Sequence, residues 1–376
     1  MKTVSEIIES GRCYACGMCS VRCPENAISL KPNMKSGFYE VHLNDDACVG
    51  CGLCLSSCPA AANSKVKSDT LGEHKSIYLC RSTDESVRKG ATSGGAVNAV
   101  IRFLIESKTA DSVLAVKENS DSPFESEAVV INRENCSLLT EEPRSFASRY
   151  VSIPVLNALK QCTGKTAVVG TPCQIKALGS YGKDIIKIAI ACSGATSYNA
   201  SKIIKERLAD SSFRVFYRGN GWPGYNTLTD GKKVIEAPHG KSYFERMYTS
   251  QLFRSRACRN CPSHFGEESD LTFFDFWNSE EIKNERLGNS VCTVRTETGS
   301  VIFNGAVNGG YLETVRELVE DEAVKTQGVA LKYKSLRPYN GIYFKLIDFL
   351  FKTGLYRLIP LKGYKYFCRL LAKTVK

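Results

Sequence analysis

The sequence predicts an α+β protein in three parts, and three observations support this fold class. One cysteine motif occurs twice before residue 60, short apolar runs then alternate with helix-like stretches up to about residue 308, and the C-terminal end mixes basic with apolar side chains. The 376 residues are enough for two or three domains, and 43% hydrophobic with 24% charged residues is typical of a globular protein. The expected parts are 1–62, 76–335 and 336–376, with residues 63–75 as a polar linker.

The first part contains the runs Cys13-Tyr-Ala-Cys16-Gly-Met-Cys19-Ser-Val-Arg-Cys23-Pro24 and Cys48-Val-Gly-Cys51-Gly-Leu-Cys54-Leu-Ser-Ser-Cys58-Pro59. Each has the spacing C-x2-C-x2-C-x3-C-P, which binds [4Fe–4S] clusters in bacterial ferredoxins. The fourth cysteine starts a helix that points elsewhere, so it is expected to bind the other cluster. Zinc and disulfides are weaker alternatives, because both repeats are complete with their prolines. The predicted ligand sets are Cys13, Cys16, Cys19 and Cys58 for one cluster, and Cys48, Cys51, Cys54 and Cys23 for the other.

The residues between the two motifs predict a β-hairpin. Strand-like segments 27–31 and 38–43 flank a turn-rich connection at 32–37. A two-cluster ferredoxin fold with a slightly long central hairpin is therefore expected for residues 1–62. A module of this kind transfers electrons.

Composition indicates the compartment and limits the partners. The first ten residues have acids where a signal peptide needs an apolar core, so export is not expected. The seventeen cysteines are then best interpreted as thiols of a reducing compartment, and the expected location is the cytoplasm. The formal charge of +11 is compatible with an acidic protein partner, nucleic acid or an anionic membrane. Nucleic acid is rejected, because the basic and aromatic segment 214–225 matches no recognition motif.

The second part alternates between strand-like and helix-like patterns, which predicts a mixed α/β domain. The expected strands are 76–80, 112–116, 128–132, 166–169, 185–191, 214–217 and 271–276. The expected helices are 96–106, 154–161, 174–178, 199–209, 243–254 and a further one, rich in Glu and Leu, within 311–335.

A glycine-containing loop, Gly90-Ala-Thr-Ser-Gly-Gly-Ala96, precedes the first of these helices. Thr92 or Ser93 is expected to cap the helix, and the paired glycines allow backbone N–H groups to approach a ligand. The loop suits a phosphate or the edge of a flavin ring. The same pattern also occurs in ordinary turns.

Four cysteines of the second part form a candidate metal site. A buried strand ends at Gly170 and a helix starts at Cys173, where the helix N-terminus is expected to lower the pKa of the thiol. Cys258-Arg-Asn-Cys261-Pro262 is half of a metal site, and Cys173 and Cys192, at the ends of predicted strands, are the best candidates to complete it. A third cluster is favoured over zinc and over free thiols. The remaining cysteines are expected to be small buried hydrophobes: Cys80, Cys136, Cys162, Cys292 and Cys368.

The third part is basic and amphipathic. Residues 341–376 contain eight Lys or Arg against the single acid Asp348, and the apolar run 342–351 is too short and too interrupted to span a bilayer. An amphipathic helix lying on an anionic membrane surface is one interpretation. A terminal helix packed on its own domain, with a solvated basic face, is the other. The basic face consists of Lys362, Lys365, Arg369, Lys373 and Lys376.

Residues 1 to about 308 resemble the family of the coenzyme F420 hydrogenase/dehydrogenase β subunit. The resemblance rests on the ferredoxin module, Thr92-Ser-Gly-Gly95, Ser148-Arg-Tyr150, Gly170-Thr-Pro-Cys-Gln174, the 258–261 cysteine pair and Ser269-Asp-Leu-Thr-Phe-Phe-Asp-Phe-Trp277. Through Trp222 and Asp275-Phe-Trp277 the chain is most similar to a bacterial branch associated with surface polysaccharide biosynthesis. It departs from that branch at Cys192-Ser193-Gly194, where relatives carry Cys-His-Gly, and at Phe274-Asp275, where they carry Gly-Asp. No catalytic role of that histidine is therefore carried over.

The resemblance implies cofactors and residues to hold them. Family members are typically iron–sulfur flavoproteins, which pass electrons between [4Fe–4S] clusters, FAD and a two-electron acceptor, such as F420 in archaeal enzymes or a chlorophyll derivative in a plant relative. It implies a third cluster on Cys173, Cys192, Cys258 and Cys261. It also implies FAD near Thr92, Ser93, Gly94, Gly95, Ser148, Tyr150, Gly170, Thr171, Pro172 and Gln174.

The function expected from these features is that of an iron–sulfur flavoprotein oxidoreductase. A donor such as ferredoxin is expected to supply electrons through the clusters to FAD, for reduction of a small molecule such as a glycan precursor. An F420- or nicotinamide-coupled electron-entry subunit of a larger complex is one alternative. A non-catalytic electron-transfer module is another.

Overall fold

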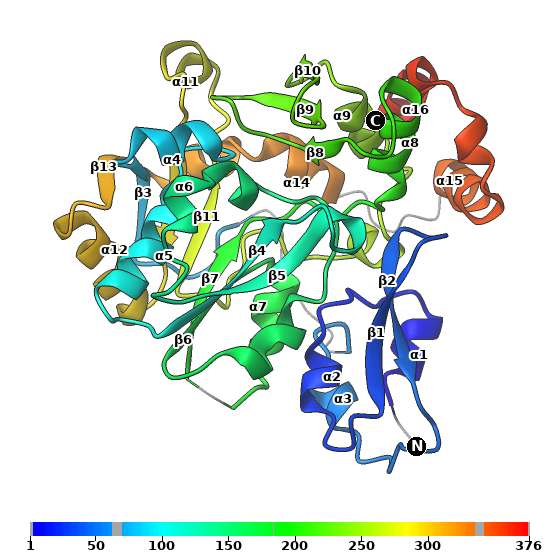
Figure 1. The fold of residues 1–376 in the computed structure, drawn as a ribbon, viewed down its shortest axis with the longest axis horizontal. Coiled ribbons are helices and arrows are strands. Elements are labelled where there is room, and N and C mark those ends of the chain that lie inside the picture. Colours follow the sequence, from blue (N-terminus) through cyan, green and yellow to red (C-terminus); the bar gives the residue numbers. More distant parts are fainter. Residues whose placement is uncertain (1–2, 62–69, 183, 335–341, 375–376) are drawn as a thin grey trace.

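The computed structural model describes residues 3–61, 70–182, 184–334 and 342–374, and it confirms the predicted fold class (Figure 1). A small N-terminal domain of the ferredoxin type is followed by a mixed α/β domain and by C-terminal helices. Residues 63–69 of the predicted linker and 336–341 of the predicted C-terminal part lie outside the described residues.

The N-terminal module is organised around one hairpin. Its two strands pair antiparallel, with Ile28 opposite Leu43 and Asn33 opposite Phe38, so the long hairpin predicted here is present. Its small core contains Val4, Ile28 and Cys54. The elements are α1 (Ser5–Glu9), α2 (Met18–Arg22), β1 (Ile28–Asn33), β2 (Phe38–Leu43) and α3 (Leu53–Ser56).

The second domain is built on an eight-stranded sheet with the order β13-β3-β12-β11-β7-β6-β4-β5. The central neighbours β4, β6, β7 and β11 run parallel, and the outer pairs are antiparallel. Parallel strands covered on both faces need apolar side chains throughout, which explains runs such as Thr-Ala-Val-Val-Gly in β6. The strands are β3 (Ser76–Ser82), β4 (Ser112–Glu118), β5 (Ser126–Ile131), β6 (Thr166–Gly170), β7 (Ile185–Ile190), β11 (Leu271–Asp275), β12 (Ser290–Val294) and β13 (Leu312–Glu317).

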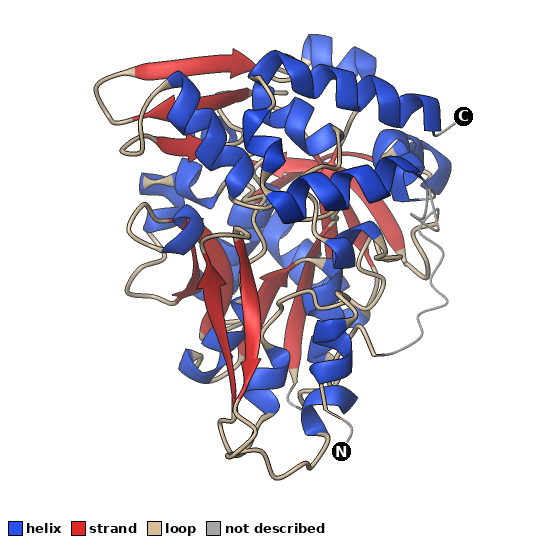
Figure 2. Cartoon of the chain, turned by 90° about the vertical axis from the view of Figure 1, so that its right-hand side faces the viewer, coloured by secondary structure: helices blue, strands red, loops and turns tan. Residues whose placement is uncertain are grey.

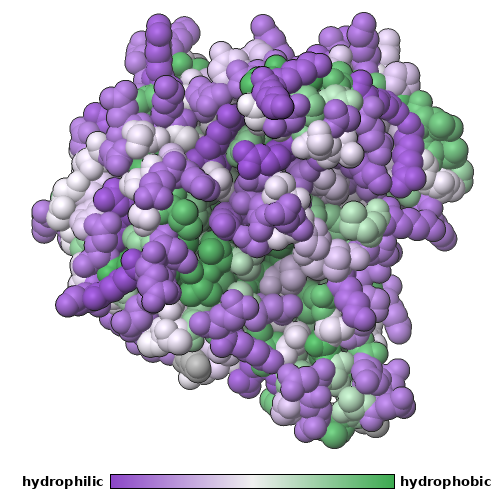
Figure 3. All heavy atoms as spheres, in the orientation of Figure 1, coloured by the Kyte–Doolittle hydropathy of each residue, from purple (hydrophilic) through white to green (hydrophobic). Residues whose placement is uncertain are grey.

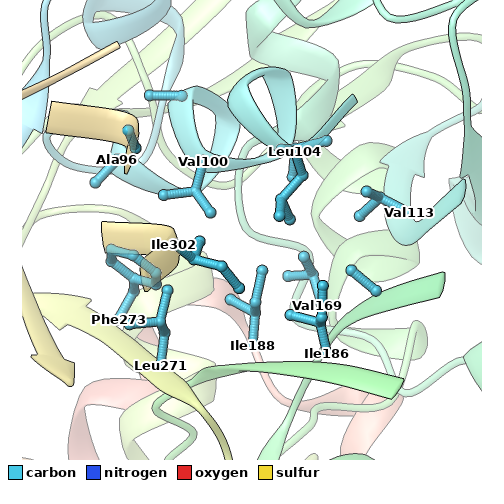
Figure 4. Packing of buried hydrophobic residues seen from close by; sticks show 14 of the residues in the cluster. Ala96, Val100, Leu104, Val113, Val169, Ile186, Ile188, Leu271, Phe273 and Ile302 are labelled. Atoms are coloured by element: carbon cyan, nitrogen blue, oxygen red, sulfur yellow. The ribbon is translucent and has the colours of Figure 1, made fainter. Parts of the chain in front are cut away.

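Helices cover both faces of this sheet. Figure 4 shows Val100 and Leu104 of α5 and Ile302 of α12 packed against Ile188 and Phe273 of the strands. On the opposite face, α7 and the 3₁₀ helix η3 pack on the parallel strands. The elements of this domain are α4 (Glu85–Gly90), α5 (Ala96–Glu106), η1 (Pro123–Glu125), α6 (Leu138–Glu141), η2 (Pro143–Phe146), η3 (Val155–Gln161), α7 (Pro172–Leu178), α10 (Arg256–Arg259), α11 (Ser279–Asn284), α12 (Glu297–Asn308), α13 (Glu320–Lys325) and α14 (Gly328–Lys334).

A second apolar core joins a three-stranded sheet, of order β10-β9-β8, to the C-terminal helices. The ring of Phe253 contacts the rings of Phe351, Tyr356 and Tyr364, so the C-terminal part packs on its own domain. Among the described residues, no helix has the length and apolar character needed to cross a membrane. The elements are α8 (Asn199–Leu208), β8 (Arg214–Phe216), β9 (Tyr225–Thr229), β10 (Val234–Pro238), α9 (Tyr243–Thr249), α15 (Ile342–Thr353), η4 (Leu355–Leu358), η5 (Leu361–Gly363) and α16 (Tyr364–Thr374).

Two backbone hydrogen bonds between described residues join the N-terminal module to the rest of the chain. Its first cysteine loop is bound to η3, where the Leu156 N–H donates to the Cys16 carbonyl at 3.1 Å. The turn of its hairpin lies against the start of α8, where the Tyr198 N–H donates to the Gly37 carbonyl at 3.0 Å. In Figure 2 the two strands of the hairpin extend from the lower part of the molecule toward the C-terminal helices.

Several predicted elements differ from those observed. Segment 154–161 is a 3₁₀ helix, and the helix expected at 243–254 ends at Thr249. The helix expected within 311–335 is present as two short helices, α13 and α14, but the strand β13 that precedes them was not predicted. This edge strand buries Leu312 and exposes the next five side chains, so the alternation that marks a half-buried strand is absent. Strands β9, β10 and β12 were not predicted, although Asp230-Gly231 between β9 and β10 is a hairpin signal.

We predict that Gly37→Ala loosens the contact between the module and α8. Gly37 has φ +69, and a Cβ there would lie 2.4 Å from Ser197 Oγ and 2.9 Å from the Asn199 backbone nitrogen. Gly231→Ala is the matched control, because its φ is +93 but nothing lies within 4 Å. Both variants should lose about 1 kcal/mol to the positive φ, and Gly37→Ala should lose about 1–3 kcal/mol more through overlap. Thermal unfolding measures the difference, and equal losses would contradict this packing.

Candidate functional site

Three groups of cysteines were predicted, and the structure brings the first together from both motifs. Cys13, Cys16 and Cys19 lie beside Cys58, close enough for each thiol to affect the ionisation of the next. Burial is the main cause that raises the pKa of Cys16, to about 12, and neighbouring thiols add to it. The crossed arrangement expected from the motif is therefore present among these four residues. Their binding of a cluster stays a prediction.

The loop around this group has the backbone that close packing requires. Gly17 has φ +94, and a Cβ there would overlap Asn157 of η3. Ala15 also has a positive φ, and its N–H donates to Cys13 Sγ at 3.3 Å. A cavity at this loop is lined by the four cysteines of this group together with apolar side chains of α1 and β2. Buried sulfurs that accept backbone hydrogen bonds suit a cluster, whose potential depends on such bonds.

The second predicted group lies on the outer side of the module. Cys23 and Cys54 share one apolar cluster with Cys19 and Cys58. The Ala27 N–H donates to Cys23 Sγ at 3.3 Å. Cys51 is exposed to solvent. If a cluster occupies Cys23, Cys48, Cys51 and Cys54, it is the one nearer the surface.

The third predicted group also converges, although its four members come from distant parts of the chain. Cys173 is the second residue of α7, which follows β6, and Cys192 follows the neighbouring strand β7. Cys258 lies in α10 and Cys261 just after it. The electrostatic influence of Cys261, Cys192 and Cys258 on Cys173 shows that the four thiols are neighbours. The Ala195 N–H donates to Cys258 Sγ at 3.4 Å. Among the described residues, no group of three or more His, Cys, Asp or Glu side chains is arranged to hold a single metal ion.

The ionisation of this third group corrects one expectation. Burial, and then the neighbouring Cys261 and Cys192, raise the pKa of Cys173 well above its usual value, so the expected lowering by the helix N-terminus is outweighed. Burial also raises the pKa of Cys192 to about 11, although the nearby Lys334 ammonium opposes this. Lys334 is buried and donates to the Ser263 carbonyl at 2.5 Å. Four neighbouring, half-buried thiols are the donor set that an iron–sulfur cluster needs.

Tyr14 connects the first and third groups. It stands between Cys13 and Cys16, yet its side chain is hydrogen-bonded to Cys261 and lies near Cys173 and Cys258. Burial and these thiols raise the pKa of its hydroxyl. The Ser152 hydroxyl donates to the Tyr14 carbonyl at 3.0 Å and fixes the loop. The first cysteine loop of the module is therefore packed directly against the third cysteine group.

A second centre forms around Arg218, which sequence analysis did not single out. Its buried guanidinium donates to the carbonyls of Thr92 at 3.1 Å and Pro223 at 2.9 Å, and it pairs with Asp275 at 3.2 Å. Burial lowers its pKa, but Asp275 and Tyr150 outweigh burial and raise it. The guanidinium carbon lies 5.2 Å from the ring of Trp222 and 5.0 Å from that of Trp277. The two indole rings are 4.6 Å apart.

Two buried polar atoms near this centre lack partners among the described residues: Trp222 Nε1 and Asn289 Oδ1. Asn289 is linked to the predicted loop, because Ser93 Oγ donates to its carbonyl at 2.7 Å. Buried polar groups are normally hydrogen-bonded, so unpartnered ones beside an aromatic wall indicate a place for a ligand.

The ten residues predicted to contact FAD separate into two sets. Ser148 N–H donates to Thr92 Oγ1 at 2.7 Å, and Tyr150 is hydrogen-bonded to Arg218, which places the first set at the Arg218 centre. This set is Thr92, Ser93, Gly94, Gly95, Ser148 and Tyr150. The second set lies around Cys173: Gly170, Thr171, Pro172 and Gln174. Contact of either set with FAD stays a prediction.

The details of these two sets correct the expected helix cap. The N-cap of α5 is Gly95 without a side-chain bond, so neither Thr92 nor Ser93 caps this helix. Gly94 is needed for packing, because a Cβ there would lie 2.8 Å from the Ser290 nitrogen. Both polar atoms of the Gln174 side-chain amide form hydrogen bonds within the protein. Oε1 accepts from the Thr171 N–H at 2.8 Å, and Nε2 donates to the Ile153 carbonyl at 3.2 Å. Gln174 thus positions the start of α7 and Cys173.

Two tyrosines link the Arg218 centre to the third cysteine group. The rings of Tyr150 and Tyr248 are 5.2 Å apart, and Tyr150 bonds Arg218. Tyr248 is hydrogen-bonded to Ser193 and lies near Cys192. Sequence analysis missed Tyr14, Arg218 and Tyr248, because no spacing marks a residue whose partners are all remote in the chain. Trp222 and Trp277, which the sequence marked only through the family resemblance, lie over Arg218.

Comparisons with known protein families match most of the chain. The model described as coenzyme F420 hydrogenase/dehydrogenase, β subunit N-terminus, matches residues 77–160, and the corresponding C-terminus model matches residues 163–318. A 4Fe-4S dicluster domain matches residues 12–62.

Individual relatives agree with these models. The chain is 24% identical to the β subunit of coenzyme F420 hydrogenase of Methanococcus voltae, over 65% of this chain and 85% of the relative. It is 22% identical to one of the subunits of the F(420)H(2) dehydrogenase of Methanosarcina mazei, over 94% of this chain and 97% of the relative. A chain of the F420-reducing [NiFe] hydrogenase complex of Methanosarcina barkeri shares the fold, with a TM-score of 0.53 and 19% identity over 72% of this chain and 93% of that chain.

Proposed function

We propose that this chain, which belongs to the family of the coenzyme F420 hydrogenase/dehydrogenase β subunit, is an iron–sulfur flavoprotein oxidoreductase. Electrons would enter at the N-terminal 4Fe-4S dicluster domain and leave at the Arg218 centre. The observation that carries the proposal is the convergence of Cys173, Cys192, Cys258 and Cys261 directly beside Tyr14 of that domain.

The order of the sites supports a linear path. Exposed Cys51 marks the outer group, and Cys13, Cys16, Cys19 and Cys58 form the inner group of the module. Tyr14 joins the inner group to the third group, and Tyr248 with Tyr150 joins the third group to Arg218. Electron transfer needs such closely spaced centres, because its rate falls steeply with distance. A donor such as ferredoxin would dock near the outer group.

The Arg218 centre is the place we propose for FAD. The paired indoles, the buried guanidinium and the unpartnered Trp222 and Asn289 atoms fit an aromatic ligand that carries negative charge. FAD, when bound, would supply the exchange between one-electron transfer from clusters and two-electron reduction of an organic substrate. Asp275 would hold Arg218 in place, and the loop 92–95 would close the site from the side of α5.

Two substrate classes follow from this proposal. A glycan precursor is the first class to test, because the sequence resembles the branch associated with surface polysaccharide biosynthesis. Coupling to F420 is the second candidate, favoured by the names of the Methanococcus and Methanosarcina relatives. An assay of whether the purified protein reduces F420 or nicotinamide cofactors distinguishes the two candidates. Such activity would support an electron-entry subunit over an enzyme that reduces a glycan precursor.

Removal of one thiol from the third group should remove one cluster. Three [4Fe–4S] clusters give roughly twelve irons per chain, and Cys258→Ala is expected to leave roughly eight. Iron and sulfide analysis after anaerobic purification measures this change. Cys136→Ala is the control, because Cys136 is buried in the main core beneath α5, and it should keep roughly twelve. An unchanged iron count in Cys258→Ala means that the third group holds no cluster.

Tryptophan fluorescence should report the flavin site. The chain has two tryptophans, and both lie over Arg218. Removal of FAD is therefore expected to raise tryptophan emission several-fold, and addition of FAD to quench it again. Emission that stays constant while FAD binds would place the flavin elsewhere. Protein that is purified without flavin and binds none would support the non-catalytic module instead.

Loss of the Tyr14 hydroxyl should change the third cluster without removing it. A hydrogen bond to a ligating sulfur offsets its negative charge and favours the reduced cluster, so Tyr14→Phe is expected to lower the midpoint potential. A tenfold change in the reduction equilibrium is about 59 mV for one electron, and a redox titration followed by electron paramagnetic resonance resolves it. Tyr78→Phe is the control, since Tyr78 stacks on Phe303 at 4.6 Å in the main core. Equal potentials in wild type and Tyr14→Phe would exclude this contact.

A further inference from the structure

The C-terminal helices have an unusual distribution of apolar side chains. Of the sixteen large hydrophobic residues that are exposed in the described part of the chain, seven lie between residues 342 and 370. On α15, Ile342, Leu346 and Phe349 are exposed at a spacing of four and three residues, which places them on one face. Ile342 is 88% exposed. Figure 3 shows hydrophobic residues gathered where Figure 1 places α15.

The opposite face of each helix is already buried against the protein. Tyr343, Phe344 and Ile347 of α15 belong to the second apolar core. Tyr364 and Leu371 of α16 belong to the same core, while Tyr366 and Leu370 are exposed. A surface helix of a globular protein normally presents polar residues to water. Packing into the core therefore accounts for the buried apolar residues of these helices, but not for the exposed ones.

The connection between the helices continues the same surface. Leu355 and Leu358 of η4 are exposed, and Leu358 is 77% exposed. The connection is held in place by Arg207, whose guanidinium donates to the carbonyls of Arg357 and Ile359. The exposed leucines thus belong to a fixed segment of the fold.

Cations are interspersed with these apolar residues. None of them forms a salt bridge with another described residue, and the single acid of the segment, Asp348, is paired with Arg259. The exposed cations are Lys345, Lys352, Arg357, Lys362, Lys365 and Arg369. We call the surface formed by these cations and by the exposed apolar residues of 342–370 the C-terminal face. The side chains of 372–374 lie outside the description.

We propose that the C-terminal face binds the surface of a membrane that contains anionic lipids. Its free cations complement negatively charged headgroups, and its aliphatic and aromatic side chains can enter the boundary between headgroups and acyl chains. A protein partner would require an acidic surface with matching apolar pockets, whereas a lipid surface requires only the mixture of charge and apolar area seen here. This inference is independent of the proposed redox function.

The test uses the full chain and vesicles of defined composition. Flotation with phosphatidylcholine vesicles is compared with flotation on vesicles that also contain phosphatidylglycerol. Binding is expected to be at least about tenfold tighter to the anionic vesicles, and to weaken as salt shortens the range of the attraction. Failure to bind anionic vesicles would overturn the proposal.

Two pairs of variants separate the apolar and the charged contributions. Leu358→Asp should weaken binding at least about tenfold, whereas Val301→Asp, at a 68% exposed position on α12, should bind like the wild type. Lys345→Glu with Lys352→Glu should abolish the preference for anionic vesicles. Lys232→Glu with Lys233→Glu gives the same net charge at exposed positions between β9 and β10 and should retain that preference.

Other outcomes identify a different occupant of the C-terminal face. Light scattering after size exclusion measures the mass of the wild type and of Leu358→Asp. A wild-type dimer that becomes a monomer in Leu358→Asp would show that two copies cover this face, and would overturn the lipid proposal. Equal binding by Leu358→Asp and Val301→Asp would overturn it as well.

Discussion

The structure depends on the meeting of four thiols that are far apart in the sequence. Cys173 and Cys192 are neighbours because β6 and β7 pair in parallel and both continue into the same edge of the sheet. Cys258 and Cys261 lie in and just after α10, outside the strands of this sheet. Burial makes thiolates costly here, as the raised pKa values of Cys173 and Cys192 show, so an uncompensated group of this kind opposes folding. A positively charged centre would relieve this cost, and we propose that a cluster supplies it.

Both ends of the chain support this group. From the N-terminus, Tyr14 contacts Cys261, and the Cys16 carbonyl is bound to η3. From the C-terminus, Asp348 of α15 pairs with Arg259, the last residue of α10, which directly follows Cys258. The Tyr343 hydroxyl donates to the Ser250 carbonyl in the segment before α10. Helix α15, which carries part of the C-terminal face, therefore also contacts the segment that holds Cys258 and Cys261.

Features of the structure were predictable from the sequence where a few neighbouring residues carry the signal for them. The cysteine runs of the module carry their spacing in a few residues, so the ferredoxin-type fold and the crossing of Cys58 to the first motif were predictable. The convergence of Cys173 with Cys192 was predictable because strand ends gather at one edge. Arg218 was not, because its partners Thr92, Tyr150 and Asp275 are each remote in sequence. Strand β13 was missed because, at the sheet edge, pairing with β3 rather than an apolar pattern defines it.

The central claim is that the module and the α/β domain form one electron path through the contact of Tyr14 with the third group. Electron paramagnetic resonance of the fully reduced protein tests it most directly, because paramagnetic clusters close to one another broaden and split each other's signals. We expect an interacting spectrum in the wild type that simplifies when Cys192→Ala removes the third cluster. A wild-type spectrum equal to the sum of isolated clusters, unchanged by Cys192→Ala, would contradict the claim.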